Sequence, residues 1–510
     1  MTPEPFDLLL QRRAAEDPGA PALGDDHTVL DRGALHAQVE RVAAALQRDG
    51  VRPGQAVAMC AATAVPQALV FLGALRAGAV PAPIPTSVTP GQFEAMVADS
   101  GAAFVFVDAK APALGPTPGR RLVSLDGVAA GADFQAWLAP PGARAAAVEV
   151  QAGDPFDIIY SSGTTGTPKG IVHPQSMRAA QVGRAVRYAL DASSVMLLAT
   201  PLCSNTTLVA FLPALACGAR VQLMGRFDTA GYLRLAQDLC ATHTMLVPVQ
   251  YQRLMAHPDV DRADLRAFRM KLCTSAPFTP ALKTQVLARW PGGLLEIYGM
   301  TEGGGSCFLD AHLHPGKLHT VGRPAEGHDI RLIDEDGREL PPGPQTVGEV
   351  VGRSVSMMTG YHGRPAQTRE AEWFDAQGRR FIRTGDIGRF DEDGFLILMD
   401  RRKDIIISGG FNLYPSDLEA VLREHPAVAD AAVFGVPSAQ WGETPVACVV
   451  ARAGVAPCDP ETLRHWANER LGRTQRLAGV RWVAELPRSA IGKVLRRELR
   501  LGWGEGGSEG

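Results

Sequence analysis

The sequence lacks the features that mark several common protein classes. Its charge is nearly balanced, with 51 Lys and Arg against 54 Asp and Glu, so the net charge of −3 gives no general attraction to nucleic acid or to an anionic membrane. The N-terminal stretch MTPEPFDLLLQRR has no apolar core of the kind found in signal peptides. The most apolar region, residues 56–85, is interrupted by Pro66, Gln67 and Arg76, so it indicates buried helix and strand and no membrane span.

Cysteine pairs are also missing. None of the eight cysteines forms a CxxC pair, so neither a zinc site nor a disulfide framework is indicated. A reducing compartment fits this usage, and we expect a cytoplasmic protein. The cysteines are scattered over positions 60, 203, 217, 240, 273, 307, 448 and 458.

The 510 residues exceed the size of one ordinary core, so at least two domains are expected. Strand patterns alternate with amphipathic helical patterns over most of residues 1–400, which predicts layered α/β structure with largely parallel sheets. Residues 320–400 are rich in Gly, Pro and Asp turns between short strands, which predicts a small antiparallel or barrel-like piece. A compact α+β pattern follows over residues 401–510.

Two helix starts are predicted in this last segment. Ser416 and Glu419 have the spacing of a capping box at the beginning of a helix in YPSDLEAVLREHP. Asp459 followed by Pro460 is the favoured order of an N-cap and a first helical residue.

The stretch YSSGTTGTPKG, residues 160–170, resembles a loop built to hold phosphate. It follows the strand pattern DPFDIIY and precedes a helix predicted from about Pro174, so we expect it at the carboxyl end of a strand in an open sheet. Its glycines, hydroxyls and single lysine suit a polyphosphate. It is not a Walker A loop, because Pro168 precedes the lysine and Gly170 follows it. A flexible surface loop is the alternative interpretation.

Four further stretches accompany this loop: YGMTEGG at 298–304, RTGD at 383–386, DRRKDIIISGGFNLYPSDLE at 400–419 and PRSAIGKVLRREL at 487–499. In this order the five stretches resemble the adenylate-forming superfamily of acyl-CoA synthetases, peptide-synthetase adenylation domains and luciferases. The resemblance covers nearly the whole chain and is greatest to bacterial acid:CoA ligases. It implies an N-terminal AMP-binding domain over residues 1–400 and a small mobile C-terminal domain over residues 401–510.

The resemblance also implies a reaction. A carboxylate attacks the α-phosphate of ATP to form an acyl adenylate, pyrophosphate leaves, and the thiol of coenzyme A then takes the acyl group. The implied partners are a small-molecule carboxylic acid, ATP, Mg²⁺ and coenzyme A, with no nucleic acid and no membrane span. A homodimer is an open question.

Nucleotide-site roles follow from the match. Glu302 would bind Mg²⁺, Thr301 a phosphate oxygen and Tyr298 the adenine, while Gly299 would let base and acyl group approach the backbone. Without the resemblance, Glu302 would be interpreted as a solvated loop carboxylate. Phosphate contacts would come from Lys169 as a catalytic cation and from Ser161, Ser162, Gly163, Thr164, Thr165 and Gly166.

The C-terminal motifs add the ribose, hinge and lysine positions. Asp386 would accept hydrogen bonds from the ribose hydroxyls, although an Asp in a TGD turn is more often structural. Arg401 would help hold ribose or phosphate, and Lys403 occupies the hinge position. Lys493 matches the lysine that offsets repulsion between the two anions during adenylation. The alternatives are a basic linker for Arg401 and Lys403 and a surface role for Lys493.

The thiol half-reaction is assigned to another segment. Ser408, Gly409 and Gly410 resemble the part of the family that forms the pantetheine tunnel. Trp441 is placed where some aryl-CoA ligases have a tryptophan near coenzyme A, and packing in a core is the equally weighted alternative.

The acyl pocket departs from the pattern of relatives. Where many ligases have Pro-Leu-aromatic-His, this chain has Pro-Leu-Cys-Ser, so Ser204 and Asn205 stand in for the histidine. Thr274 replaces a glycine beside the pocket, and Met300 adds a further wall. We expect a small or medium acid, hydroxylated or branched. A strong preference for palmitate would contradict this.

Two other functions stay open. One is an acyl-AMP ligase that loads a separate carrier protein. The other is a catalytically silent nucleotide-binding protein, against which the presence of Lys169, Glu302, Asp386, Arg401 and Lys493 argues. An amino acid substrate is disfavoured, because residues 203–208 contain no acidic side chain to pair with an α-ammonium group.

Overall fold

The computed structural model describes residues 4–115, 119–161, 169–408, 411–438, 440–472, 475–489 and 492–505. The chain forms two compact units, each with its own hydrophobic core. Unit 1 comprises Met1–Ile330 and Gly352–Ile382, and unit 2 comprises Arg331–Val351 and Arg383–Gly510. The domain boundary at residue 400 stays a prediction. Within the described residues, no helix is both long and apolar enough to span a membrane.

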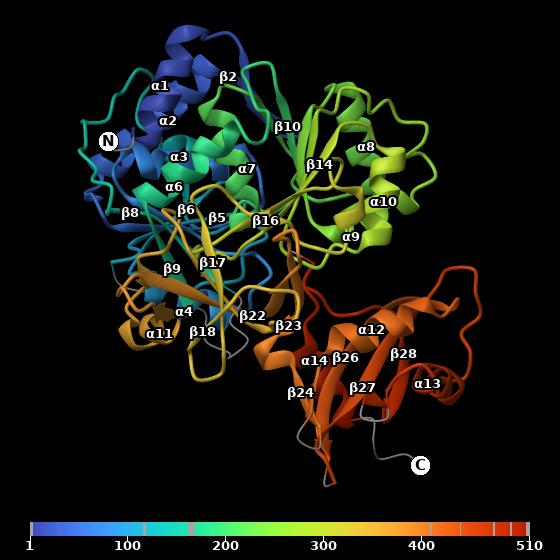
Figure 1. Cartoon of the computed structure of the whole chain (residues 1–510). Helices are drawn as coiled ribbons and strands as arrows, with labels where there is room; N and C mark the ends of the chain where they lie inside the picture. Colours follow the sequence, from blue (N-terminus) through green and yellow to red (C-terminus); the bar gives the residue numbers. More distant parts are fainter. Residues whose placement is uncertain are drawn as a thin grey trace. The chain divides into compact units, whose positions relative to one another are not determined.

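A nine-stranded sheet forms one layer of unit 1, and its strands from β14 to β1 run parallel, while β2, β15 and β16 join antiparallel at the edges. Figure 1 shows α8, α9 and α10 gathered beside β14. The strands in spatial order are β16 (Arg323–Pro324), β15 (Cys307–Asp310), β14 (Gly293–Tyr298), β13 (Met270–Cys273), β12 (His243–Leu246), β10 (Val195–Leu198), β11 (Arg220–Leu223), β1 (Pro21–Gly24) and β2 (Val29–Asp31). The associated helices are α1 (Phe6–Glu16), α7 (Asn205–Ala216), α8 (Thr229–Asp238), α9 (Pro248–Ala256) and α10 (Pro280–Arg289).

A second sheet of unit 1 has five parallel strands. Helix α3 is apolar on nearly all sides and is buried along most of its length, as expected for a helix inside a core. The strands are β4 (Val80–Pro83), β3 (Ala56–Cys60), β5 (Phe104–Val107), β6 (Arg121–Ser124) and β7 (Ala132–Asp133), and the helices are α2 (Arg32–Arg48), α3 (Val65–Arg76), α4 (Pro90–Ser100) and α5 (Phe134–Trp137).

The segment around the glycine-rich stretch departs from the prediction. The helix predicted from about Pro174 is confirmed, since α6 (Gln175–Val182) has Pro174 as its N-cap. The residues before it were expected to form a loop, but β8 (Pro155–Ser161) pairs antiparallel with a second strand, β9 (Lys169–Pro174). Strand β20 (Gly360–Tyr361) completes this three-stranded sheet. Because β20 lies far along the chain, the local sequence gives no sign of this third strand.

The region of short strands is antiparallel, as predicted. In unit 1, β21 (Glu372–Phe374) pairs with the first part of β22 (Arg380–Phe390). In unit 2, the rest of β22 pairs with β23 (Leu396–Arg401), and β17 (Asp329–Ile333) pairs with β18 (Glu339–Leu340). The remaining elements of this region are η2 (Pro315–Lys317), β19 (Gly348–Arg353), α11 (Pro365–Glu370) and η3 (Arg402–Asp404), and η1 (Gly183–Ala185) follows α6.

The C-terminal segment is an α+β structure around a five-stranded sheet. Its strands are β25 (Phe411–Leu413), β24 (Ile406–Ser408), β27 (Gly442–Ala451), β26 (Val428–Ser438) and β28 (Gly479–Val483), and its helices are α12 (Pro415–Glu424), α13 (Pro460–Asn468) and α14 (Arg496–Glu505). The predicted fold class is therefore confirmed: a large mixed α/β part with several sheets, a small barrel-like piece, and a small α+β C-terminal part.

One of the two predicted helix starts is confirmed. Asp459 accepts a hydrogen bond from the backbone N–H of Thr462 and caps α13. The capping box at Ser416 is wrong, because α12 already begins at Pro415 and its N-cap is Tyr414. The N–H of Ser416 donates instead to Asp400, at 2.7 Å.

Glu419, the other half of the expected capping box, has a longer-range role. Its Oε1 accepts from the N–H of Val433 at 3.0 Å and from Arg496 at 2.6 Å. Arg496 also donates to the carbonyl of Val433, at 3.1 Å. These contacts fasten α12, β26 and α14 to one another around a buried carboxylate.

Candidate nucleotide and acyl site

The candidate residues divide between the two units. Unit 1 holds Lys169, Ser204, Asn205, Thr274, Tyr298, Gly299, Met300, Thr301 and Glu302, and unit 2 holds Asp386, Arg401, Lys403, Ser408, Trp441 and Lys493. Ser161 ends β8, and only its backbone is described. The residues that lie outside the described part of the chain are Ser162, Gly163, Thr164, Thr165, Gly166, Gly409 and Gly410.

A tyrosine joins two of the predicted charged groups in unit 1. The hydroxyl of Tyr361 donates to Oε1 of Glu302 at 2.9 Å, and Nζ of Lys169 lies 5.0 Å from the centroid of the Tyr361 ring. Burial, and next the charge of Glu302, raise the pKa of Tyr361, so its hydroxyl stays a donor. Sequence reasoning missed Tyr361, because it lies in β20, 59 residues from Glu302.

The backbone of Glu302 is held by close packing of glycines. The N–H of Met358 donates to the carbonyl of Glu302 at 2.9 Å, and the N–H of Gly304 donates to the carbonyl of Ser356 at 2.8 Å. Gly303 has a φ of +75°, and a Cβ there would lie 2.1 Å from the Ser356 carbonyl oxygen. A side chain at Gly303 would therefore separate the Glu302 segment from residues 356–358.

The donor set suits Mg²⁺. Among the residues that the structure describes, His, Cys, Asp and Glu side chains form no group of three that could hold a metal ion. A single carboxylate is enough for Mg²⁺, which usually keeps several waters and takes phosphate oxygens as further ligands. Glu302 fits that role, and Tyr361 orients its carboxylate.

A buried charged network, which the sequence did not reveal, contacts the backbone of the residue before Glu302. Asp157, His173 and Arg178 have fully buried side chains. Asp157 is 2.6 Å from His173 Nδ1 and 2.6 Å from Arg178 Nη2. His173 Nε2 donates to the backbone carbonyl of Thr301 at 2.7 Å, and this hydrogen bond fixes the position of Thr301. Burial acts to raise the pKa of Asp157, but the charges of Arg178 and His173 outweigh it and the pKa is lowered.

The same network reaches the acyl-pocket candidates. Nη1 of Arg178 donates to Oδ1 of Asn205 at 2.7 Å, and Asn205 is the first residue of α7. Ser204 is the N-cap of α7 and accepts from the N–H of Thr206 at 3.2 Å. The hydroxyls of Thr206 and Ser275 lie 2.5 Å apart, so the segments 204–206 and 274–275 are brought together.

Other acyl candidates have defined positions. Thr274 donates its hydroxyl to the carbonyl of Ile297 at 2.7 Å. Met300 packs against a small cluster of Ile171, Met358 and Ile382. Burial raises the pKa of Cys203 to about 12, which leaves this thiol protonated and unreactive.

Unit 2 brings the ribose and lysine candidates together. Asp386 and Arg401 are cross-strand neighbours in β22 and β23, and Arg401 Nε lies 3.1 Å from Asp386 Oδ1. Lys493 follows Gly492 in a turn, where the N–H of Ser489 donates to the Lys493 carbonyl at 2.8 Å. Burial, and then repulsion from Arg401 and Lys403, lower the pKa of Lys493 to about 8.

The thiol-site candidates share one edge of the C-terminal sheet. Ser408 pairs with Gly442, and Trp441 directly precedes Gly442. The Trp441 residue is 50% exposed, which excludes burial in the core of unit 2. Ile407 and Phe411 on the adjoining hairpin are each 58% exposed, so this edge is markedly apolar.

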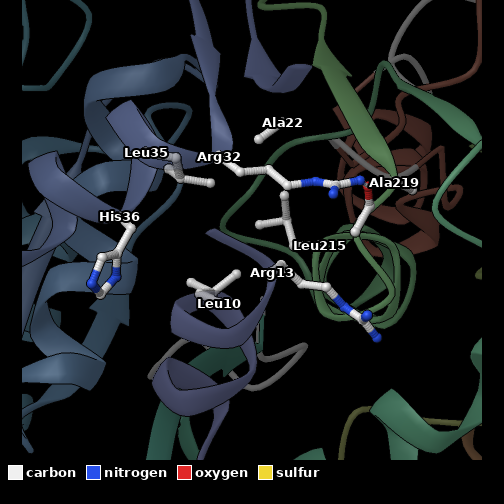
Figure 2. A pocket seen from close by; sticks show the side chains of 9 residues that line it. Leu10, Arg13, Ala22, Arg32, Leu35, His36, Leu215 and Ala219 are labelled. Carbon is white, nitrogen blue, oxygen red and sulfur yellow. Dashed lines mark hydrogen bonds between the residues drawn. The ribbon is translucent and has the colours of Figure 1, made fainter. Parts of the chain in front are cut away.

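Two cavities in unit 1 are lined by none of these candidates. Figure 2 shows the smaller one, where Arg13 and Arg32 lie at the end of α7. These arginines donate to the carbonyls of Ala216 and Gly218, so they cap a helix end. The cavity volume of about 10 Å³ leaves room for no more than about one water molecule. The second cavity, about 270 Å³, lies between α1 and α6.

Comparisons with protein families match both parts of the chain. Residues 10–362 match the model described as AMP-binding enzyme, and residues 417–493 match the AMP-binding enzyme C-terminal domain.

Individual relatives align over almost the full length. A fatty acid–[acyl-carrier-protein] ligase, ScoC, from Streptomyces coeruleorubidus is 32% identical over 96% of this chain and 95% of its own. A feruloyl-CoA synthase from an Amycolatopsis species is 33% identical over 97% of this chain and 98% of its own. The structure of ATP-bound MatB from Rhodopseudomonas palustris superposes with a TM-score of 0.84 at 28% identity, over 98% of this chain and 99% of that one.

Proposed function

The chain belongs to the family of AMP-binding enzymes and is an adenylate-forming acid ligase, and on that premise we propose an ATP-dependent carboxylic acid:CoA ligase that releases AMP and pyrophosphate. The observation that carries the proposal is the Lys169–Tyr361–Glu302 cluster, which puts a cation for phosphate and a carboxylate for Mg²⁺ on the same tyrosine.

In the proposed adenylation, a carboxylate oxygen of the acid bonds to the α-phosphorus of ATP, and the bond from that phosphorus to pyrophosphate breaks. Lys169 offsets negative charge on the phosphates, and Lys493 offsets the repulsion between the two reacting anions. Asp386 accepts hydrogen bonds from the ribose hydroxyls, with Arg401 beside it. Glu302 would hold Mg²⁺, which when bound would neutralise charge on the leaving pyrophosphate.

In the proposed second step the thiol of coenzyme A attacks the acyl carbonyl and AMP leaves. The apolar edge with Ser408 and Trp441 supports a role in holding the pantetheine arm, and the resemblance assigns Gly409 and Gly410 to the same role. The proposal includes domains at 1–400 and 401–510 with Lys403 as hinge, a small or medium acid as substrate, and a location in the cytoplasm.

A carrier protein in place of coenzyme A is the second candidate. It is favoured by the similarity to the Streptomyces ligase, whose name gives an acyl-carrier protein as acceptor. In this version the exposed Ile407, Phe411 and Trp441 would face the carrier.

The test is AMP release across a panel of carboxylic acids, with ATP and Mg²⁺, with and without coenzyme A. Turnover that requires one acid and coenzyme A supports the ligase. Pyrophosphate exchange without any effect of coenzyme A favours the carrier-protein version, and no exchange with any acid favours a silent nucleotide-binding protein. The variant Lys493→Ala should abolish adenylation yet keep thioester formation from supplied acyl adenylate. Equal loss in both steps would contradict the role of Lys493.

A further inference from the structure

The orientation of Asn205 is determined by a side chain that can only donate. Arg178 is fully buried, and its guanidinium has no acceptor atom. Since Nη1 of Arg178 lies 2.7 Å from the Asn205 side chain, the atom of Asn205 that faces it is the carbonyl oxygen. The Nδ2 group of Asn205 then points away from Arg178, and within the described part of the chain it has no hydrogen-bond partner.

Arg178 has no remaining capacity to bind a substrate. Nε donates to Oδ2 of Asp157 at 2.9 Å, and Nη2 lies 2.6 Å from the same oxygen and 2.9 Å from His173 Nδ1. Nη1 donates to Gln181 and to Asn205, each at 2.7 Å. The N–H groups of the Arg178 guanidinium are therefore all directed at partners within the network, and Asp157 balances its positive charge.

Two neighbouring hydroxyls already take part in hydrogen bonds. The Thr274 hydroxyl donates to the carbonyl of Ile297. The Thr206 hydroxyl is paired with that of Ser275. At the start of α7, Asn205 is half-buried, and Arg178 fixes the direction in which its N–H₂ group points.

We propose that Asn205, positioned by Arg178, is a specificity-determining hydrogen-bond donor, and that the enzyme activates acids carrying an uncharged oxygen acceptor, such as a keto or ether oxygen, along the acyl chain. The inference rests on the proposed function, which puts Asn205 in the acyl pocket. A plain alkyl acid would leave the Asn205 N–H₂ group desolvated and unpaired. A second carboxylate would find no free charge on Arg178.

The experiment compares acids of equal length in the AMP-release assay. One set is pentanoate, 4-oxopentanoate and glutarate, and the other is hexanoate, 5-oxohexanoate and adipate. In at least one set the oxo acid should exceed the alkyl acid by about two- to tenfold in kcat/KM, the value of one neutral hydrogen bond, and it should also exceed the diacid. Equal kcat/KM for oxo and alkyl acids in both sets overturns the inference.

Two matched variants separate a specificity role from a structural one. In Asn205→Asp a carboxylate oxygen still accepts from Arg178, but the donor is replaced by an acceptor, so the oxo-to-alkyl ratio should fall to about one or below. Gln181 is the second residue that accepts from Nη1 of Arg178, and it is buried in α6. The control Gln181→Glu makes the same amide-to-carboxylate change at that residue and should keep the wild-type oxo-to-alkyl ratio. An unchanged ratio in Asn205→Asp, or the same fall in Gln181→Glu, overturns the assignment to Asn205.

The two proposals fail in different ways. If no acid supports AMP release while ATP still binds in calorimetry, the ligase function is wrong and the inference falls with it. If acids turn over with no preference for an oxygen acceptor, the ligase function stands and only the inference is wrong. The wild-type ratios decide this even if Asn205→Asp does not fold.

Discussion

The buried pair of Asp157 and Arg178 gives a quantitative stability prediction. Replacing Asp157 by Asn removes the charge that faces Arg178 at 2.6 and 2.9 Å and leaves a guanidinium with no exposed surface. An uncompensated buried charge typically costs about 3–5 kcal/mol of folding free energy. Since the unfolding entropy of a unit this large is roughly 0.7 kcal/mol/K, the midpoint of thermal unfolding should fall by about 4–7 °C.

The assay is thermal unfolding of the full chain followed by circular dichroism, with Asp264→Asn as the matched control. Asp264 also contacts an arginine at 2.7 Å, but the Asp264–Arg266 pair is exposed, so no measurable change is expected. The double variant Asp157→Asn with Arg178→Met should lose less stability than the two single variants added together. A shift below 1 °C in Asp157→Asn, or strict additivity, would refute the view that these charges depend on each other.

Three more outcomes follow from the site. Tyr361→Phe removes the donor to Glu302, so about three- to tenfold more Mg²⁺ should be needed for half-maximal adenylation, and an unchanged requirement in a Mg²⁺ titration would separate Tyr361 from the metal. Reductive methylation of Lys493 read by mass spectrometry should have its midpoint near pH 8, because the pKa is lowered to about 8 and the neutral amine reacts. A midpoint near the ordinary lysine pKa of 10.5 would contradict the burial and repulsion around it. Gly303→Ala should lower adenylation at least tenfold, since its Cβ collides with Ser356, whereas Gly316→Ala, which has open space, should not, and equal rates would show that the contact is dispensable.

The elements of the fold could be predicted where the residues that determine them are close together in the sequence. The alternation of strands and helices gave the parallel sheets, and Asp459 and Pro460 marked the start of α13 correctly. The capping box at Ser416 failed because a proline one residue earlier starts the helix and a distant carboxylate, Asp400, takes the Ser416 N–H. The pairing of β9 with β20 could not be predicted locally, because β20 lies near residue 360.

The site shows the same division. Glu302, Asp386 and Lys493 are candidates drawn from motifs, whose residues are close together in sequence, and their roles stay predictions. Tyr361 and the Arg178 network could not, because each acts through a contact with a residue from another element and has no motif of its own. Motif matching therefore identifies the groups proposed to touch substrate, while the groups that orient them become visible only in three dimensions.

The anchoring of α14 through Arg496 matters for anyone who shortens the protein. The match to the C-terminal domain of the family ends at residue 493, which would suggest that a recombinant fragment can stop there. Such a fragment would lose Arg496 and leave the buried Glu419 carboxylate without its partner at 2.6 Å. Recombinant fragments should therefore extend beyond α14. An affinity tag that displaces α14 would also disturb the contacts of Arg496 with Glu419 and Val433.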